Sequence, residues 1–311
     1  AGTVFRSLPL PRHRGGQTIE RWQSGTNHVR IRTRHETRMT TVTMHPKSRQ
    51  IINVMHITDT HLFADGNGRL LGLNTEQSLQ AVIRTALMDR SHIDLVLATG
   101  DLVHDGTPAA YRRIFSWLEK FGLPVYCLAG NHDEARTLEH CLDNPRVHYV
   151  PQLTQDDWQF NFLDSTHDGS EGGHLDRHDL QSLDEQLAAA PEKHALVCLH
   201  HQPVPMGSRW LDTMAVDNAG DFFNVIDRHP QVRGILWGHV HQSFDDERKG
   251  VRLMATPSTC IQFLPGSEKF ALDTAAPGYR WLSLHPDGRI ETGVERLEEI
   301  PGALDLASAG Y

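Results

Sequence analysis

An Asp and a His two positions apart follow an apolar segment near residue 60. In extended backbone, residues i and i+2 point to the same side, so Asp59 and His61 can present a carboxylate and an imidazole to one point at a strand end. These two ligand types together can bind a divalent metal ion. A single Asp-x-His is weak evidence, because a chain with 21 His and 39 Asp and Glu residues contains such pairs by chance.

The same pattern, an apolar segment followed by metal-binding side chains, recurs four more times. The later stretches are Gly100-Asp101, Gly130-Asn131-His132-Asp133, His200-His201 and Gly238-His239-Val240-His241. A glycine precedes the polar side chains in three of the four, which leaves room where the backbone must approach the site closely. Five such clusters in order indicate one composite metal site.

Two divalent ions about 3.5 to 4 Å apart need a ligand that both share, and a carboxylate with two oxygens suits that role. Asp101 is the candidate for the shared ligand. Mixed imidazole and carboxylate ligands favour Fe, Mn or Zn over the oxygen-only sites that Ca and Mg prefer. We therefore expect two divalent metal ions per chain, Fe or Mn in the first place, with Zn, Co and Mg as alternatives.

Apolar strands and amphipathic helices alternate over most of the chain, and short strands follow toward its end. The predicted strands are Ile51–Ile57, Asp94–Thr99, Pro124–Leu128, Trp158–Leu163, Ala195–Leu199, Val232–Trp237, Arg252–Thr256, Tyr279–His285 and Arg289–Leu297. The predicted helices are Glu76–Met88, Ala109–Phe121 and Asp176–Ala189. In sheets with helical crossovers, chemistry collects where strands end. Two packed sheets flanked by helices, an α/β fold of the α+β sandwich type, account for this pattern.

The charge is unevenly distributed along the 311 residues. Residues 1–50 carry ten basic and two acidic residues, which leaves the remainder with 20 basic against 37 acidic ones. A remainder with this excess of acidic residues is expected to bind nucleic acid poorly, because affinity for nucleic acid depends on Lys and Arg side chains that neutralise phosphates. The basic segment lacks apolar periodicity, and Met44 offers an alternative start. We expect a weakly ordered basic arm over residues 1–45 and one catalytic domain over residues 46–311.

No segment approaches the roughly 20 apolar residues that a membrane-spanning helix needs, and the first residues lack the pattern of a signal peptide. We therefore expect a cytoplasmic protein without a membrane span. The four cysteines, Cys127, Cys141, Cys198 and Cys260, form no C-x-x-C pair. A structural role is the better interpretation of each, and we expect none of them to bind the metals.

The ordered motifs D-x-H, G-D, G-N-H-D, a strand-ending H and G-H-x-H resemble those of the calcineurin-like metallophosphoesterase superfamily, and they span Asp59 to His241. The flanking stretches Leu199–Pro203, Ala255–Phe263 and Leu272–Gly278 resemble bacterial class III 3',5'-cyclic AMP phosphodiesterases. That closer resemblance covers about Ile51 to Tyr311. It implies the superfamily's four-layer architecture, with two packed mixed β-sheets flanked by helices.

The resemblance also implies a role for each motif residue. The first metal would be held by Asp59, His61, Asp101 and His241, and the second by Asp101, Asn131, His200 and His239. His132 would be the general acid, oriented by Asp133. The substrate phosphate would contact His61, Asn131, His132 and His201. His200, the first His after its strand, matches the ligand position, which leaves His201 outside the ligand set.

Several residues keep two interpretations. Asp59, Asp101 and Asn131 could be loop caps at strand ends, although seven ligands in order argue against this. His104 and Asp105 either orient the site or belong to a loop that enters a helix capped near Thr107-Pro108. Trp210, Phe263 and Tyr279 either line a base pocket or, as is more common for aromatic residues, fill the core.

The implied activity is hydrolysis of 3',5'-cyclic AMP to 5'-AMP by a hydroxide that bridges the two metals. His132 would donate a proton to the departing 3'-oxygen. One alternative is a phosphodiesterase for another diester, such as a 2',3'-cyclic nucleotide or a glycerophosphodiester, because metals recognise only the phosphate. The other is a catalytically silent binding module, against which the full ligand set argues.

Overall fold

The computed structural model describes residues 18–21, 29–32, 50–89 and 92–310. The chain divides into two compact units, Ala1–Arg49 and Gln50–Tyr311. Most of the predicted arm, residues 1–45, lies outside the described residues. Within it, strand β1 (Thr18–Arg21) pairs antiparallel with β2 (Val29–Arg32). No helix of the described residues is long and apolar enough to cross a membrane.

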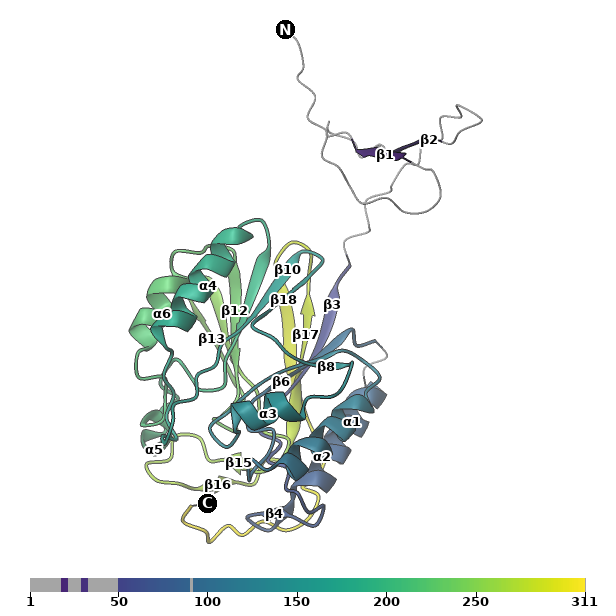
Figure 1. The fold of residues 1–311 in the computed structure, drawn as a ribbon. Helices are drawn as coiled ribbons and strands as arrows, with labels where there is room; N and C mark the ends of the chain where they lie inside the picture. The colour runs from purple at the N-terminus through teal and green to yellow at the C-terminus, as the bar shows by residue number, and fades with distance from the viewer. Residues whose placement is uncertain (1–17, 22–28, 33–49, 90–91, 311) are drawn as a thin grey trace. The chain divides into compact units, whose positions relative to one another are not determined.

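Two six-stranded mixed sheets form the unit from Gln50 onward (Figure 1). The first sheet has the order β18 (Ile290–Arg296), β17 (Gly278–Leu284), β3 (Ile52–Ile57), β6 (Leu95–Thr99), β7 (Val125–Leu128) and β8 (Val147–Tyr149). The second has the order β13 (Phe244–Arg248), β14 (Val251–Ala255), β12 (Val232–Trp237), β11 (His194–Cys198), β10 (Trp158–Phe162) and β9 (Gln152–Gln155). In each sheet the inner strands run parallel, β3, β6 and β7 in the first and β10, β11, β12 and β14 in the second.

Helices cover the outer face of each sheet. Those of the first sheet are α1 (Thr75–Asp89), α2 (Pro108–Glu119) and α3 (Ala135–Cys141). Those of the second are α4 (Arg177–Ala189), α5 (Arg209–Asp212) and α6 (Ala219–Ile226). Two short strand pairs complete the unit, β4 (Arg69–Leu70) with β5 (Leu73–Asn74), and β15 (Gln262–Phe263) with β16 (Leu272–Asp273).

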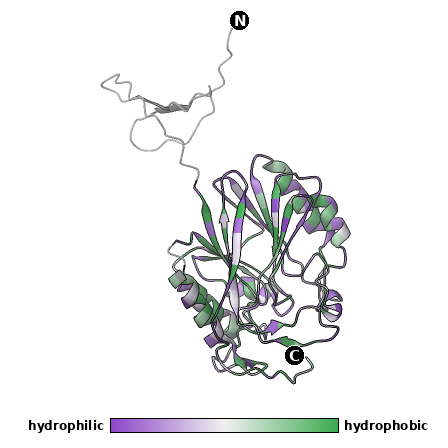
Figure 2. Cartoon of the chain, turned by 180° about the vertical axis from the view of Figure 1, so that it is seen from behind, coloured by the Kyte–Doolittle hydropathy of each residue, from purple (hydrophilic) through white to green (hydrophobic). Residues whose placement is uncertain are grey.

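The alternation of side chains along the strands explains the layers. In β3, Val54 packs between the two sheets, whereas Met55 faces the helices of the first sheet. Leu97 and Ala98 of β6 divide in the same way, because neighbouring residues of a strand point to opposite faces. Figure 2 shows hydrophobic stretches along the strands of both sheets. The result is the predicted helix, sheet, sheet, helix order, and the predicted fold class is confirmed.

The predicted elements agree with the observed ones to within a few residues, and the exceptions are short. The elements that the sequence pattern did not indicate include α3, α5, α6, the edge strands β8 and β9, and the short strand pairs. The edge strand β13 was also not indicated, and its sequence contains three consecutive acidic residues, Asp245 to Glu247. The predicted N-cap of α2 is present, since Thr107 accepts a hydrogen bond from the Ala110 N–H at 3.3 Å. This cap begins the helix directly after the loop that carries Asp101.

Candidate metal centre

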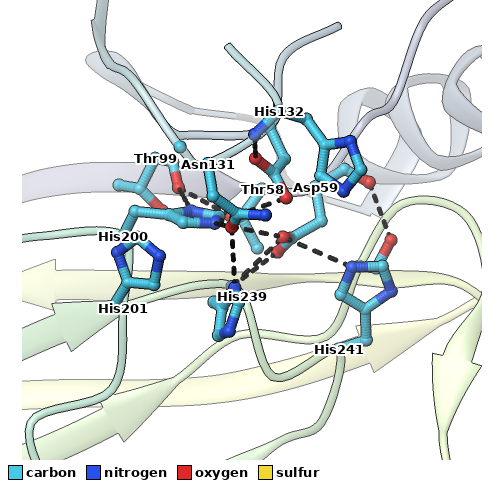
Figure 3. Close-up of polar contacts among 12 residues, drawn as sticks. Thr58, Asp59, Thr99, Asn131, His132, His200, His201, His239 and His241 are labelled. Atoms are coloured by element: carbon cyan, nitrogen blue, oxygen red, sulfur yellow. Dashed lines mark hydrogen bonds and ion pairs between the residues drawn. The ribbon is translucent and has the colours of Figure 1, made fainter. Parts of the chain in front are cut away.

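All seven predicted metal ligands lie together at one end of the two sheets. Each follows the carboxyl end of a parallel strand, which is β3, β6 or β7 in the first sheet and β11 or β12 in the second. The seven are Asp59, His61, Asp101, Asn131, His200, His239 and His241. Figure 3 shows the labelled members of this set pointing toward one another. Six of the seven are buried, and Asn131 is partly exposed.

Four of these residues form what we call the first donor group: Asp59, His61, Asp101 and His241. The Nε2 atoms of His61 and His241 are 3.3 Å apart. His61 Nε2 lies 3.5 Å from Asp101 Oδ2, and His241 Nε2 lies 3.4 Å from Asp59 Oδ1. Two imidazole nitrogens and two carboxylate oxygens therefore surround one small volume.

The second donor group consists of Asp101, Asn131, His200 and His239. Asn131 Oδ1 lies 3.2 Å from His200 Nε2 and 3.0 Å from His239 Nδ1. His200 Nε2 is also 3.4 Å from Asp101 Oδ2, the oxygen that faces His61 in the first group. One carboxylate oxygen thus borders both groups, as the sequence predicted for the shared ligand.

The spacing of these atoms fits divalent metal ions. Metal–ligand bonds of about 2.1 Å place neighbouring ligand atoms roughly 3.0 to 3.4 Å apart in octahedral or tetrahedral geometry. The donor atoms of both groups are spaced close to this range. Their nitrogen and oxygen chemistry suits Fe, Mn, Zn or Co better than Ca.

The second ring nitrogen of several histidines is held by the protein. His200 Nδ1 lies 2.9 Å from the carbonyl oxygen of Thr99, and His241 Nδ1 lies 2.8 Å from that of Ile261. A carbonyl only accepts, so each Nδ1 carries a proton, which leaves Nε2 as the nitrogen available to a metal. These backbone contacts thereby fix the orientation of both rings toward the site.

Burial and the charge of Asp101 determine the protonation of three histidine ligands, His61, His239 and His200. It lowers the pKa of His61 and of His239 well below the usual value, so both rings are neutral and able to bind a metal. Burial also disfavours the imidazolium of His200, but the adjacent Asp101 carboxylate outweighs it and raises the pKa of His200 to about 9. In the metal-free protein a proton therefore occupies the position where a cation would bind.

The backbone at the ligands differs from the extended geometry on which the sequence argument rested. Five ligands have a positive φ: Asp59 (52°), His61 (42°), Asp101 (48°), His239 (63°) and His241 (47°). The i, i+2 explanation is therefore wrong, although the convergence that it predicted is present. The strands end before their ligands, and after β3, β6 and β12 left-handed residues turn the chain so that the side chains reach one point. Such strained backbone is concentrated at functional sites.

Two glycines allow the loops to approach the ligands. Gly100 has φ of 88°, and a Cβ there would collide with the ring of His200. A Cβ on Gly130 would collide with Asp101 Oδ1 and the Asp101 backbone nitrogen. Both positions were predicted to require close backbone approach, and both exclude any side chain.

His132 and Asp133 lie beside the first donor group. The His132 ring is 4.8 Å from that of His61, and its backbone N–H donates to Asp101 Oδ1 at 2.9 Å. The Asp133 carboxylate accepts from the Gly130 N–H at 2.9 Å and the Tyr111 hydroxyl at 3.0 Å. These bonds hold the loop on which His132 sits. Burial, with the charge of Asp101, raises the pKa of Asp133 to about 7.

The sequence left two interpretations open for His104 and Asp105, and in the structure the two residues have different surroundings. The His104 ring stacks on His132 at 4.9 Å, and its Nδ1 lies 3.3 Å from His61 Nδ1. Asp105 instead accepts from the Thr107 N–H at 3.1 Å, inside the loop that enters α2. His104 thus belongs to the surroundings of the site, and Asp105 belongs to the loop.

His201 lies outside both donor groups, behind His239, with ring centroids 4.6 Å apart. Its Nδ1 lies 2.9 Å from Ser165 Oγ, while its backbone N–H donates to the same hydroxyl oxygen at 3.2 Å. The ring is buried, and the backbone of Glu171 also interacts with it.

The three aromatic residues singled out in the sequence have different positions. Trp210 and Phe263 line a cavity beside His239, together with Phe270, which the sequence analysis missed. Phe270 lies in a loop without an apolar period, so no local pattern identified it. Tyr279 is only 1% exposed and packs in the core of the first sheet, which confirms the core interpretation for this residue.

Cys260, for which the sequence predicted a structural role, contacts the backbone of a residue of the metal site. Its Sγ lies 3.4 Å from the carbonyl oxygen of Asp59, and the thiol is near the donor nitrogens of His61 and His241. Burial raises the pKa of Cys260 to about 12, so the group stays a neutral thiol. The residue therefore supports the backbone of Asp59. All four cysteines are free.

Two packed mixed sheets with this donor set at their strand ends have the architecture of a metal-dependent phosphoesterase. The sequence profile of the calcineurin-like phosphoesterases matches residues 52–243, and the chain belongs to that family. The family is hydrolytic and implies a centre with two metal ions.

Relatives of known name match nearly the whole of their own length. The chain is 39% identical over 267 residues to the 3',5'-cyclic adenosine monophosphate phosphodiesterase CpdA of Pseudomonas aeruginosa, covering 86% of this chain and 97% of that protein. It is 41% identical over 261 residues to CpdA of Escherichia coli strain K12, covering 84% and 95%. A dimetal phosphatase from Danio rerio shares the fold, with a TM-score of 0.56, 15% identity, and coverage of 79% and 99%.

Proposed function

We propose that the protein is a metal-dependent phosphodiesterase that hydrolyses 3',5'-cyclic AMP to 5'-AMP. The observation that carries the proposal is the similarity, at 39% and 41% identity, to two proteins of that name over 97% and 95% of their lengths. The seven donors and His132 converge on one site, as this chemistry requires.

We assign one metal to the first donor group and one to the second, with the Asp101 carboxylate between them. Bound there, divalent ions supply a hydroxide near neutral pH and stabilise negative charge on the phosphate. Fe and Mn are the ions that we expect first, because the donor set mixes imidazole nitrogens with carboxylate and amide oxygens. The buried carboxylates Asp59 and Asp101 offset part of the added positive charge.

His132 is the proton donor in this proposal. Its ring lies beside His61 and belongs to neither donor group, and its loop is fixed by the hydrogen bonds of Asp133. Its imidazolium donates a proton to the 3'-oxygen as the bond from that oxygen to phosphorus breaks, which leaves a 3'-hydroxyl and a 5'-phosphate. Asp101 accepts from the backbone N–H of His132 and so ties the proton donor to the shared ligand.

Three further groups contact the phosphate in this proposal: Asn131 through its side-chain amide, His61 along the edge of its ring, and His201 through Nε2–H. Burial lowers the pKa of His201 to about 3, so the ring is neutral and acts as a hydrogen-bond donor without charge. The ring lies beside His239, a proposed metal ligand, with centroids 4.6 Å apart, which favours a position near the phosphate.

Rates on a panel of diesters test the proposal. The panel contains 3',5'-cyclic AMP, 3',5'-cyclic GMP, 2',3'-cyclic AMP and a glycerophosphodiester, each with Mn²⁺ or Fe²⁺ added separately. We expect the highest kcat/KM among them for a 3',5'-cyclic nucleotide, with 5'-AMP as the product from cyclic AMP. A higher value for a 2',3'-cyclic nucleotide or a glycerophosphodiester would reassign the substrate. No turnover by metal-loaded protein on any diester would favour the silent binding module.

A further inference from the structure

A cavity of about 310 Å³ lies directly beside the second donor group. One wall is formed by Asn131, His132 and His239, which we assign to metal and phosphate binding. The lining also contains three aromatic residues, Trp210, Phe263 and Phe270, which we call the aromatic wall. A volume of roughly 300 Å³ is at the lower end of that found for small-molecule sites, so the cavity can hold a ligand larger than a phosphate.

The aromatic wall comes from two elements and a loop that are adjacent in space. Trp210 is in α5, Phe263 in β15, and Phe270 in the segment between β15 and β16. Trp210 meets Phe263 edge-on at 5.1 Å and Phe270 at 5.3 Å, and the two Phe rings are 5.6 Å apart. These perpendicular contacts fix the rings relative to one another.

The three residues of the aromatic wall differ in their exposure and in the residues that they contact. Phe263 is only 3% exposed and stacks face to face on the His241 ring at 4.2 Å, where it holds a metal ligand in place. Trp210 and Phe270 are partly exposed and pack against the core of the second sheet. They therefore present aromatic surface to the cavity, next to the position of the phosphate.

We propose that Trp210 and Phe270 form the nucleobase subsite and determine the preference of the enzyme for nucleotides over other diesters. The inference rests on the proposed function, because a phosphate held by Asn131, His132 and His239 leaves the rest of the substrate in the same cavity. A base is a flat π system, and stacking on aromatic side chains is the common way in which proteins hold it. A glycerophosphodiester has no group that gains from such a wall.

The test compares a ligand that has a base with one that lacks it. Binding of 5'-AMP and of ribose 5-phosphate to the Mn²⁺-loaded protein is measured by calorimetry for the wild type, Trp210→Ala and Phe270→Ala. We expect 5'-AMP to bind the wild type roughly 5- to 150-fold more tightly than ribose 5-phosphate, the range for stacking of one base. Trp210→Ala and Phe270→Ala should each remove much of that ratio and leave the affinity for ribose 5-phosphate unchanged.

Two further variants separate stacking from general damage to the fold. Trp210→Phe keeps an aromatic ring and should retain most of the ratio. Trp117→Ala removes a partly buried indole on α2 that donates to Glu76 and does not line the cavity, so it should leave both affinities unchanged. Equal losses for both ligands in Trp210→Ala and Phe270→Ala, or no loss for either, would overturn the subsite.

Failure of the subsite is distinguishable from failure of the proposed function. If the wild type hydrolyses cyclic AMP but the base adds nothing to binding, the subsite is wrong and the function stands. If the wild type binds 5'-AMP through Trp210 and Phe270 but leaves cyclic AMP intact, the function is wrong and the subsite stands. For an active enzyme, Trp210→Ala should raise KM for cyclic AMP about as much as it weakens 5'-AMP binding, with kcat changed much less.

Discussion

The two sheets contribute different chemistry to the metal centre. Strands of the first sheet precede all three oxygen donors, Asp59, Asp101 and Asn131, as well as the proposed proton donor. Strands of the second sheet precede imidazole donors alone, among them His200 and His241. In the proposed centre the first sheet would therefore supply the negative charge between the two cations, and the second would supply the imidazoles that complete each group. Substitutions on the two sides should fail in different ways.

The largest effect should come from the shared carboxylate of the first sheet. We expect Asp101→Ala to lose close to both metals and to reduce turnover to the level of the reaction without enzyme, because Asp101 Oδ2 borders both donor groups. His241→Ala, on the side of the second sheet, should lose mainly one metal. Elemental analysis of both purified variants checks this contrast. Full retention of one metal by Asp101→Ala would show that the carboxylate is not shared.

The proton donor should matter less than the shared ligand, since the metals remain without it. We expect His132→Ala to lower kcat for cyclic AMP by roughly 10²- to 10⁴-fold, the usual range for a lost general acid, with metal content unchanged. The loss should shrink for a nitrophenyl diester, whose leaving group needs no proton. Equal losses on the two substrates would leave only phosphate positioning as the role of this residue.

The pairing of His200 with Asp101 makes metal binding at the second group depend on pH. The Asp101 carboxylate overcomes burial and raises the pKa of His200 to about 9, so a metal must displace a proton below that pH. Apparent affinity should therefore rise about tenfold per pH unit from pH 7 toward 9 and level off above it. Calorimetry in buffers of different ionisation enthalpy counts the released proton. His200→Asn should abolish this proton release, and a wild type that releases none would contradict the pairing.

Substitution of two glycines, one in a loop of the site and one in a distant turn, should have a smaller effect. Gly100 and Gly250 have similar φ values, 88° and 83°, so Ala at either position costs about 1 to 2 kcal/mol of backbone strain. Only Gly100 faces the His200 ring, whereas a Cβ at Gly250 meets nothing within 4 Å. We expect Gly100→Ala to lower the unfolding free energy more than Gly250→Ala does, with a difference of about 1 to 3 kcal/mol between the two variants. Gly100→Ala should also lose metal. Denaturant unfolding and elemental analysis measure both effects, and equal behaviour would show that the crowding is unimportant.

The smallest effect should come from the basic segment, most of which lies outside the described residues. We expect deletion of residues 1–43 to leave cyclic AMP hydrolysis nearly unchanged, because all seven donors and His132 follow it in the chain. If the segment instead pairs with the acidic remainder, its removal should raise KM or lower Tm at low salt and not at high salt. Loss of most activity at low salt would show that the segment is required.

Much of the fold and of the site could be predicted because both follow from local patterns. The buried strands have near-continuous apolar sequences, and a ligand follows each of five strands. The meeting of Asp59 and Asp101 required only parallel neighbours, whereas His200 meets them because the second sheet packs on the first. The position of Asp101 between the two donor groups could also be predicted, since two metals would need one carboxylate in common. Short elements such as α3 could not, because seven residues contain too few apolar positions to show a period.

What the sequence could not provide was contact between side chains of distant segments. His104 reaches His61 only because a left-handed turn redirects the chain after β3, and no spacing rule includes such a turn. Phe270 likewise joins Trp210 through the packing of a loop on α5. The i, i+2 argument failed for the same reason, since it assumed that the strand continued through the ligands.

The relation between bound metal and rate tests the central claim most directly. Metal-free protein is titrated with Mn²⁺ under anaerobic conditions, and the initial rate on cyclic AMP is followed together with the metal bound per chain. A centre in which Asp101 joins two donor groups predicts that the rate rises to its plateau only when two ions are bound, with 5'-AMP as the product. A full rate at one ion per chain, or a rate that does not depend on metal, would contradict it.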